Sequence, residues 1–231
     1  MSSEFRKISI KIIKKTTNKF DISKKDKYAI KIQSIWRGQQ IRKMNKKLND
    51  SMSYDLLNKS IDNFNITINN EKEINKLLKK RKIRYSNFPS HISENIAKFA
   101  IYKKYGRIPN WDTDKGDLIF KNKSQIIRLE VKGSIDLSNG PPTFGPTEEW
   151  DRIYFVDGVN TSEKRYKVYE IILSNRSDTW KNIKLNKKQT YNDQCLQKRR
   201  PRLTFSEIQT QLSEHCKLIF DGHISELNDV F

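Results

Sequence analysis

A helical pattern of apolar residues opens the middle of the chain. Between residues 90 and 105 they recur at the spacing of one helix face, at Ile92, Ile96, Ala97, Ala100 and Ile101. Pro89 and Ser90 suit the start of such a helix. Gly106 suits the left-handed position that ends one, and Pro109 prevents its continuation. The pattern therefore predicts a helix over residues 90–105.

Extended segments follow this helix. Residues 116–120 (GDLIF) and 126–133 (IIRLEVKG) flank the turn-forming sequence KNKS and predict a β-hairpin. Further strands are predicted at residues 152–156 and 166–173, and a helix started by Thr204 is predicted at 205–212. This order of elements predicts an α/β fold, with a mixed β-sheet flanked by helices.

The first 85 residues differ in composition from the rest of the chain. They contain no proline and a single glycine, Gly38, and they carry 23 Lys and Arg against 8 Asp and Glu. Apolar residues at helical spacing predict two or three amphipathic helices here, near residues 30–41, 56–64 and 74–78, and residues 8–13 suggest a short strand. We therefore divide the chain into a basic, mainly helical N-terminal region, residues 1–85, and a globular domain, residues 86–231.

Composition excludes several kinds of protein. Two cysteines and three histidines without a CxxC pair disfavour structural zinc and a disulfide framework, so carboxylates must carry any chemistry. The sequence has no run of eighteen apolar residues and no cleavable signal pattern, so we expect an intracellular protein with no membrane span.

The formal net charge of +19 indicates a polyanionic partner, with nucleic acid first and an anionic membrane surface second. An A+T-rich genome also enriches Lys, Asn and Ile, so charge alone does not decide between these explanations.

Acidic and basic side chains converge on the predicted hairpin. Strand side chains alternate between faces, so Glu130 and Lys132 project to one side, while Leu129 and Val131 point to the other. The hairpin partner brings Asp117 beside them. Mg²⁺ prefers oxygen ligands and retains waters, so Asp117, Glu130 and the Val131 carbonyl form a partial metal shell suited to phosphodiester hydrolysis. Lys132 would then orient or deprotonate the attacking water.

These residues resemble the PD-(D/E)XK nuclease superfamily, and type II restriction endonucleases within it. The similarity rests on Asp117 at the head of one strand and Glu130-Val131-Lys132 on the next, and it covers about residues 86–215. A preceding helix with an acidic residue, here Glu94, is also common in that family, and residues 139–147 and 150–157 look similar. Gly116 stands where the family name puts proline. The resemblance implies a restriction-endonuclease-like fold, Mg²⁺ as cofactor, and 5′-phosphate and 3′-hydroxyl products.

Explanations without a catalytic role also remain open for the same residues. A Glu-x-Lys pair on a strand is often a solvated face. Glu94 is placed equally well for a surface ion pair with Lys98 on the same helix. Asp112 and Asp114 are alternatives to Asp117, although neither precedes an apolar strand.

Two segments are candidates for DNA contact. A basic run beyond the core strands suits phosphates and guanine edges, through Lys198, Arg199, Arg200 and Arg202. The same run is also read as a solvated surface or a nuclear localisation signal. The proline-rich loop at 138–147, with Asn139 and Thr143, is rigid enough to enter a groove.

Residues 32–42 match the IQ motif pattern IQxxxRGxxxR. Ile32, Gln33, Trp36, Arg37 and Arg42 form a basic amphipathic helix of the kind that binds a hydrophobic groove in an acidic partner. By resemblance, that partner is calmodulin or a calmodulin-like protein, which implies a eukaryotic cytoplasm or nucleus, or a virus. The alternative is a helix that packs on its own domain or lies along DNA phosphates.

The sequence thus favours a Mg²⁺-dependent type II restriction endonuclease that cuts double-stranded DNA at a short specific sequence. A homodimer is expected if a palindrome is cut on both strands. A repair or junction-resolving nuclease with the same core is the second interpretation. A non-catalytic protein that binds nucleic acid or calmodulin is the third.

Overall fold

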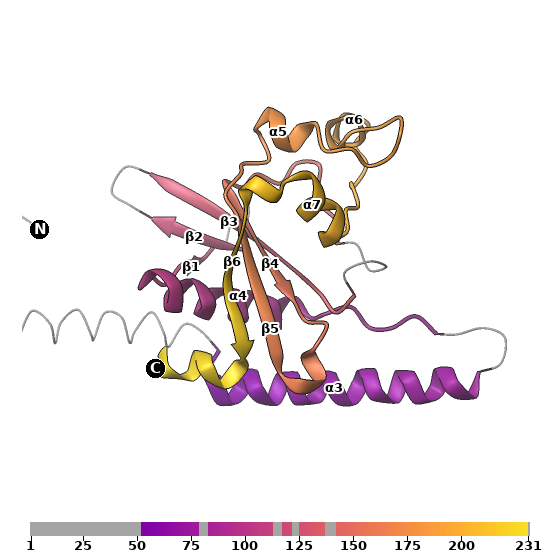
Figure 1. Cartoon of the computed structure of the whole chain (residues 1–231), viewed down its shortest axis with the longest axis vertical. Coiled ribbons are helices and arrows are strands. Elements are labelled where there is room, and N and C mark those ends of the chain that lie inside the picture. The colour runs from indigo at the N-terminus through magenta and orange to yellow at the C-terminus, as the bar shows by residue number, and fades with distance from the viewer. Residues whose placement is uncertain (1–51, 79–82, 113–116, 122–124, 137–141, 231) are drawn as a thin grey trace, which may run out of the picture. The chain divides into compact units, whose positions relative to one another are not determined.

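A six-stranded mixed sheet forms the centre of the described domain (Figure 1). The computed structural model describes residues 52–78, 83–112, 117–121, 125–136 and 142–230. The strands lie in sequence order, with β3 and β4 parallel and the other neighbours antiparallel. They are β1 (Asn110–Trp111), β2 (Leu118–Lys121), β3 (Ile126–Ser134), β4 (Arg152–Asp157), β5 (Arg165–Ile171) and β6 (Cys216–His223).

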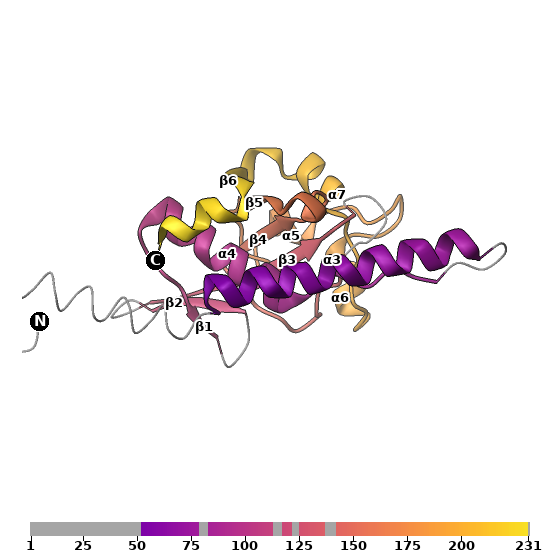
Figure 2. The same ribbon diagram turned by 90° about the horizontal axis from the view of Figure 1, so that it is seen from below.

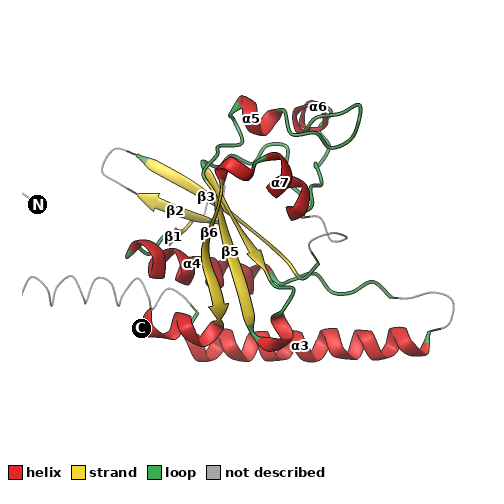
Figure 3. Ribbon diagram, viewed as in Figure 1, coloured by secondary structure: helices red, strands yellow, loops and turns green. Residues whose placement is uncertain are grey.

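Helices lie on both faces of this sheet (Figure 3). The α-helices are α3 (Tyr54–Leu77), α4 (Ser90–Tyr105), α5 (Asp178–Lys181), α6 (Tyr191–Leu196) and α7 (Phe205–Gln211). Short 3₁₀ turns are η1 (Thr161–Glu163), η2 (Ser213–His215) and η3 (Ile224–Val230). The α/β class and the mixed sheet flanked by helices are confirmed. No helix in the described part of the chain is both long and apolar enough to span a bilayer.

Side chains alternate between the two faces of the sheet along each strand, and a different helix packs on each face. On one face, Gly133 of β3 lies against Ser93 of α4, so closely that a Cβ atom there would come within 2.7 Å of Ser93 Cβ. On the other face, Phe155 of β4 stacks on Phe205 of α7 with ring centroids 4.1 Å apart. This second face carries an aromatic core that includes Phe144, Trp150, Trp180 and Tyr191.

Helix α4 occupies the predicted residues and ends as predicted, with Gly106 in the left-handed region at φ 64°. Its burial is wider than an amphipathic pattern implies, because Asn95 and Lys98 are buried together with the apolar residues. The hairpin, β4, β5 and α7 are likewise confirmed at close to the predicted bounds.

Helix α3 differs from the two or three helices predicted for the N-terminal region. One 24-residue helix covers both predicted segments that fall among the described residues, and the Ser53 side chain caps its first turn. Its buried apolar residues are Leu57, Ile61, Phe64 and Ile68, whereas Leu56, Ile74 and Leu77, counted in the predicted apolar face, are exposed. The helix is tied to the globular domain, since Asn65 Nδ2 donates to the Thr161 carbonyl at 2.8 Å and Lys164 pairs with Asp62 at 2.6 Å.

Some elements were not predicted, namely β1, β6, α5 and α6. The strand suggested at 8–13 and the IQ-like helix at 32–42, with Ile32, Gln33, Trp36, Arg37 and Arg42, lie outside the described residues, as does Asn139.

Candidate active site

Asp117 lies at the start of β2, beside the Glu-x-Lys segment of β3. Leu118 pairs with Leu129, so continuing the register by one step sets Asp117 across from Glu130. The Val131 N–H donates to Asp117 Oδ2 at 2.7 Å. In an antiparallel strand the N–H and C=O of one residue point to the same edge, so the Val131 carbonyl also faces Asp117. The structure thus brings Asp117 to the residues with which the sequence grouped it.

Glu130 and Lys132 project from β3 to the same side and form an ion pair between Glu130 Oε1 and Lys132 Nζ. Glu130 is only 4% exposed, and the Lys132 ammonium lies 5.5 Å from the centre of the Phe144 ring. The pair therefore sits at the margin of the aromatic core, where surrounding water screens the charges little.

Burial and mutual repulsion perturb the acids of this cluster. The pKa of Glu130 is raised to about 7, mainly by burial and also by the charges of Asp117 and Glu148, while the attraction of Lys132 opposes the rise. Burial also raises the pKa of Asp117, although the Val131 hydrogen bond and Lys132 oppose the shift. Burial lowers the pKa of Lys132, but Glu130, Glu148 and Asp117 together raise it above its ordinary value. The acids outnumber the cations, an arrangement that a bound cation would stabilise.

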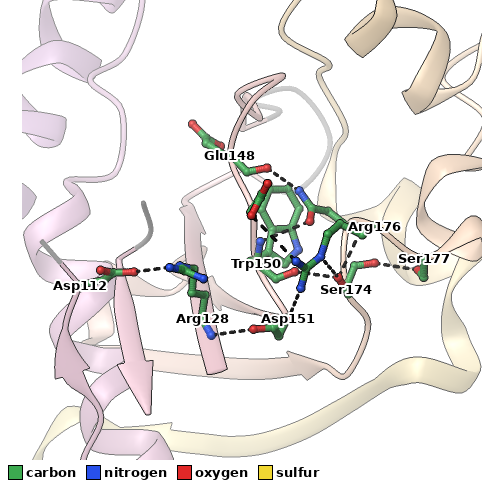
Figure 4. A network of polar contacts seen from close by, with 10 residues as sticks. Asp112, Arg128, Glu148, Trp150, Asp151, Ser174, Arg176 and Ser177 are labelled. Carbon is green, nitrogen blue, oxygen red and sulfur yellow. Dashed lines mark hydrogen bonds and ion pairs between the residues drawn. The ribbon is translucent and has the colours of Figure 1, made fainter. Parts of the chain in front are cut away.

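Glu94 reaches the cluster from α4. The pKa of Glu94 is raised to about 7, mainly by burial and also by the charge of Asp117, while a hydrogen bond from Ser90 and the attraction of Lys132 oppose the rise. Lys98, the alternative partner for Glu94, is buried with its ammonium 4.5 Å from the centre of the Trp111 ring. Asp112, the alternative to Asp117, has its carboxylate 3.7 Å from Arg128 Nε (Figure 4).

Glu148 is an acidic neighbour that the sequence did not reveal. Its Oε2 accepts from the Gly145 N–H at 2.7 Å, and its Oε1 lies 3.6 Å from Arg200 Nη2. Asn175 Nδ2 donates to the Glu148 carbonyl at 2.7 Å. Figure 4 shows the polar network to which Glu148 and Trp150 belong. A glycine three residues before the glutamate was the one sequence signal, because the carboxylate occupies the space of a Gly145 Cβ.

The predicted DNA-contact residues fall into two groups, those next to the acidic cluster and those away from the groove. Thr143 pairs with Arg202 as an isolated β-bridge, and the Phe144 N–H donates to the Pro201 carbonyl at 3.0 Å. The two loops are therefore joined next to the acidic cluster. Lys198, Arg199 and Arg200 are exposed after the end of α6 and are not among the described residues that line the groove.

A groove of about 1200 Å³ connects these parts. Its lining includes Glu94, Asp117, Lys132, Thr143 and Arg202. It also includes residues of α3 and of the segment 83–88, which the sequence did not associate with the site. The groove thus joins most of the predicted site to the helix from the N-terminal region.

The donor set fits Mg²⁺. In the described part of the chain, no group of three or more His, Cys, Asp or Glu side chains is arranged to hold a metal ion. Mg²⁺ requires fewer protein ligands, because it keeps several waters and binds through one or two carboxylates. Asp117, Glu130 and the Val131 carbonyl are hard oxygen donors on adjoining positions of two paired strands.

Comparisons with known proteins bear on the same segment. A family model described as Bsp6I restriction endonuclease matches residues 56–212. The type II restriction enzyme Bsp6I of Bacillus sp. (strain RFL6) is 32% identical over 133 residues, which is 58% of this chain and 71% of that enzyme. No solved structure matched. The relative is bacterial, so the comparison gives no support to the eukaryotic or viral setting that the IQ-like pattern suggested.

Proposed function

The chain belongs to the Bsp6I restriction endonuclease family, and from this we propose that it is a Mg²⁺-dependent type II enzyme. Its reaction would be hydrolysis of phosphodiester bonds in double-stranded DNA at a short specific sequence. The observation that carries the proposal is the contact of the Asp117 carboxylate with the Val131 N–H, between Glu130 and Lys132. DNA as substrate also supports the expected intracellular site of action.

Each residue of the site has a part in this proposal. Asp117, Glu130 and the Val131 carbonyl would hold Mg²⁺, which supplies Lewis-acid stabilisation of the charged phosphate and an acidified water. Lys132 donates to Glu130 and lies where its ammonium can also orient the attacking water and donate to a phosphate oxygen. Glu94, on the α4 side of the groove, would accept a hydrogen bond from that water.

The chemical outcome is the cleavage of one phosphorus–oxygen bond. The water oxygen bonds to phosphorus, and the bond to the 3′-oxygen breaks. The protons of the water go to the departing 3′-oxygen and to solvent, which leaves a 3′-hydroxyl and a 5′-phosphate. The reaction needs no oxidant, reductant or further substrate.

Partners other than DNA are less supported. Two copies acting on a palindromic site remain our expectation, since twofold DNA symmetry favours a twofold protein. Light scattering of the protein with and without DNA tests it. The IQ-like residues lie outside both the described residues and the family match, so a calmodulin-like partner is no part of this proposal.

The test is digestion of plasmid and genomic DNA with Mg²⁺, followed by sequencing of the fragment ends. The proposal predicts discrete, reproducible fragments and a common sequence at the cut. Lys132→Ala should reduce the cleavage rate by at least about 10²-fold, the size expected when a group acting on the transition state is lost. Lys121→Ala, which removes an exposed lysine from the paired strand β2, serves as the matched control.

Other outcomes would contradict the proposal. Cutting restricted to branched or damaged DNA would indicate a repair or junction-resolving nuclease. Absence of Mg²⁺-dependent cutting by the folded wild-type protein on all of these substrates would leave only a binding protein.

A further inference from the structure

The C-terminal part of α3 and the segment that returns from it form an ordered arm, which we define as residues 65–77 and 83–88. Four hydrogen bonds hold its halves together, three between a side chain and the backbone and one between two side chains. Asn75 Oδ1 accepts from the Ile83 N–H at 2.7 Å, and Asn75 Nδ2 donates to the Ile83 carbonyl at 3.1 Å. Glu71 Oε2 accepts from the Ser86 N–H at 2.8 Å, and its other oxygen accepts from the Ser86 hydroxyl. The arm is therefore fixed by polar contacts that do not depend on the apolar residues it exposes.

The arm also forms one wall of the groove that contains the candidate active site. Asn65, Asn69 and Lys72 line the groove from α3, and Arg84 and Asn87 line it from the returning segment. Residues 65, 69 and 72 recur at helical spacing, so they lie along one side of α3. Figure 2 shows α3 running alongside the sheet and extending past it. The groove that is lined by Glu94, Asp117 and Lys132 is thus also lined by one side of α3, from Asn65 to Lys72.

Two cationic residues of this wall, Lys72 and Arg84, are close in sequence to the residues whose hydrogen bonds hold the arm together. Lys72 follows Glu71 and precedes Asn75 by less than one helical turn, and Arg84 follows Ile83 and precedes Ser86. Both side chains belong to exposed residues. Their positions are thus set by the backbone of the arm, while their charged ends remain accessible to solvent and to a ligand.

The size and chemistry of the groove suit a polyanionic polymer. Its volume of about 1200 Å³ exceeds the usual range for small-molecule pockets of about 300–1,000 Å³. The rise from Asn65 to Lys72 is about 10 Å along the helix, which corresponds to about three base-pair steps of duplex DNA. Amide and cationic side chains at this spacing supply the donors that phosphate and sugar oxygens accept.

We propose that the arm tracks the DNA backbone beside the scissile phosphate, with Lys72 and Arg84 as phosphate ligands. The inference rests on the proposed nuclease function and extends it. It assigns DNA contact to the family-matched helix α3 and to residues that the sequence placed in a separate N-terminal region. Such contacts set affinity and register and read no base.

The test compares Lys72→Gln, Arg84→Gln and the double variant with wild type, in the full-length protein. Lys59→Gln is the matched control, because Lys59 is an exposed lysine of α3 outside the groove lining. Binding of a fluorescent DNA duplex is measured by anisotropy with EDTA present, between 50 and 200 mM salt. Circular dichroism and thermal unfolding check the fold of each variant.

Each removed phosphate contact should reduce the slope of log K against log salt by about 0.9 per bound subunit, and the double variant by about 1.8 per bound subunit. Binding should weaken several-fold at low salt in each single variant and should not change in Lys59→Gln. At subsaturating protein, the cleavage rate of Lys72→Gln and Arg84→Gln should fall in parallel with their binding, and that of Lys59→Gln should match wild type.

Unchanged salt slopes in folded Lys72→Gln and Arg84→Gln would overturn the inference. That result is distinct from failure of the nuclease proposal, which is seen as absence of cleavage by wild type. A fall in cleavage rate at saturation without any change in binding would also overturn it, because the arm would then act on the chemistry.

Discussion

Replacing Gly133 by alanine tests whether the close contact of β3 with α4 sets the geometry of the site. The added Cβ would lie 2.7 Å from Ser93 Cβ and 2.7 Å from Phe88 Cδ1. Ser93 Cβ is attached directly to the α4 backbone, so the helix itself must shift. Overpacking of this kind costs about 1–3 kcal/mol. Ser93 is next to Glu94 on α4, and Gly133 is next to Lys132 on β3. A shift of the helix would therefore move Glu94 relative to Lys132, so the cleavage rate should fall as well.

Gly158 offers a matched control on the same aromatic ring. An alanine there meets only Phe88 Cε1 and Cζ at 3.3 Å and Ile135 Cγ2 at 3.4 Å, all outer atoms of side chains that can adjust. We expect Gly158→Ala to cost less than about 1 kcal/mol. Urea unfolding with unchanged m-values, together with single-turnover cleavage, measures both variants. If Gly133→Ala matches wild type in stability and cleavage rate, the described packing of α4 on β3 is wrong.

Three further predictions concern other parts of the molecule. Tyr154→Phe removes the 2.6 Å hydrogen bond to the fully buried Glu170 and should lower the free energy of unfolding in urea by about 1–3 kcal/mol. Tyr105 donates to the same carboxylate but is half-exposed, so Tyr105→Phe should lower it by less than about 1 kcal/mol. Equal losses would contradict this account. Arg200→Ala should leave the free energy of unfolding within about 0.5 kcal/mol, since the Arg200 side chain is exposed and lies 3.6 Å from Glu148, but it should slow cleavage; wild-type turnover would remove this segment from the site. EDTA should abolish cleavage, and added Mg²⁺ should restore it, as followed on gels; cutting that persists in EDTA would exclude the metal assignment.

Local patterns explain which parts of the fold were predictable. The β2–β3 hairpin and α4 are encoded by short-range periodicity and by turn residues, and Asp117 followed from the register of that hairpin. Strand β6 was missed because its burial does not alternate and its pairing with β5 shifts register between Val168 and Tyr169. Asn75 of α3 is buried because residue 83 returns to bond it, a contact that no helical pattern contains.

The residues of the candidate site also differ in whether local sequence patterns could predict them. Glu130 and Lys132 share a face through simple alternation along one strand. Glu148 joins them from a loop without periodicity, where a local hydrogen bond from Gly145 and tertiary contacts with Asn175 and Arg200 place it. The arm was missed because its role depends on a groove between elements that are separated in the sequence.

The central claim is that Asp117 and Glu130 act as one unit in phosphodiester hydrolysis. The most direct test is the single-turnover cleavage rate of Asp117→Asn, Glu130→Gln and the double variant, with unfolding curves to show that all three are folded. Each single change should reduce the rate by at least about 10²-fold, and the double variant should be little slower than the slower single one, because groups that act together lose their effect together. Rates near wild type in either single variant, or losses that multiply in the double one, would contradict the account.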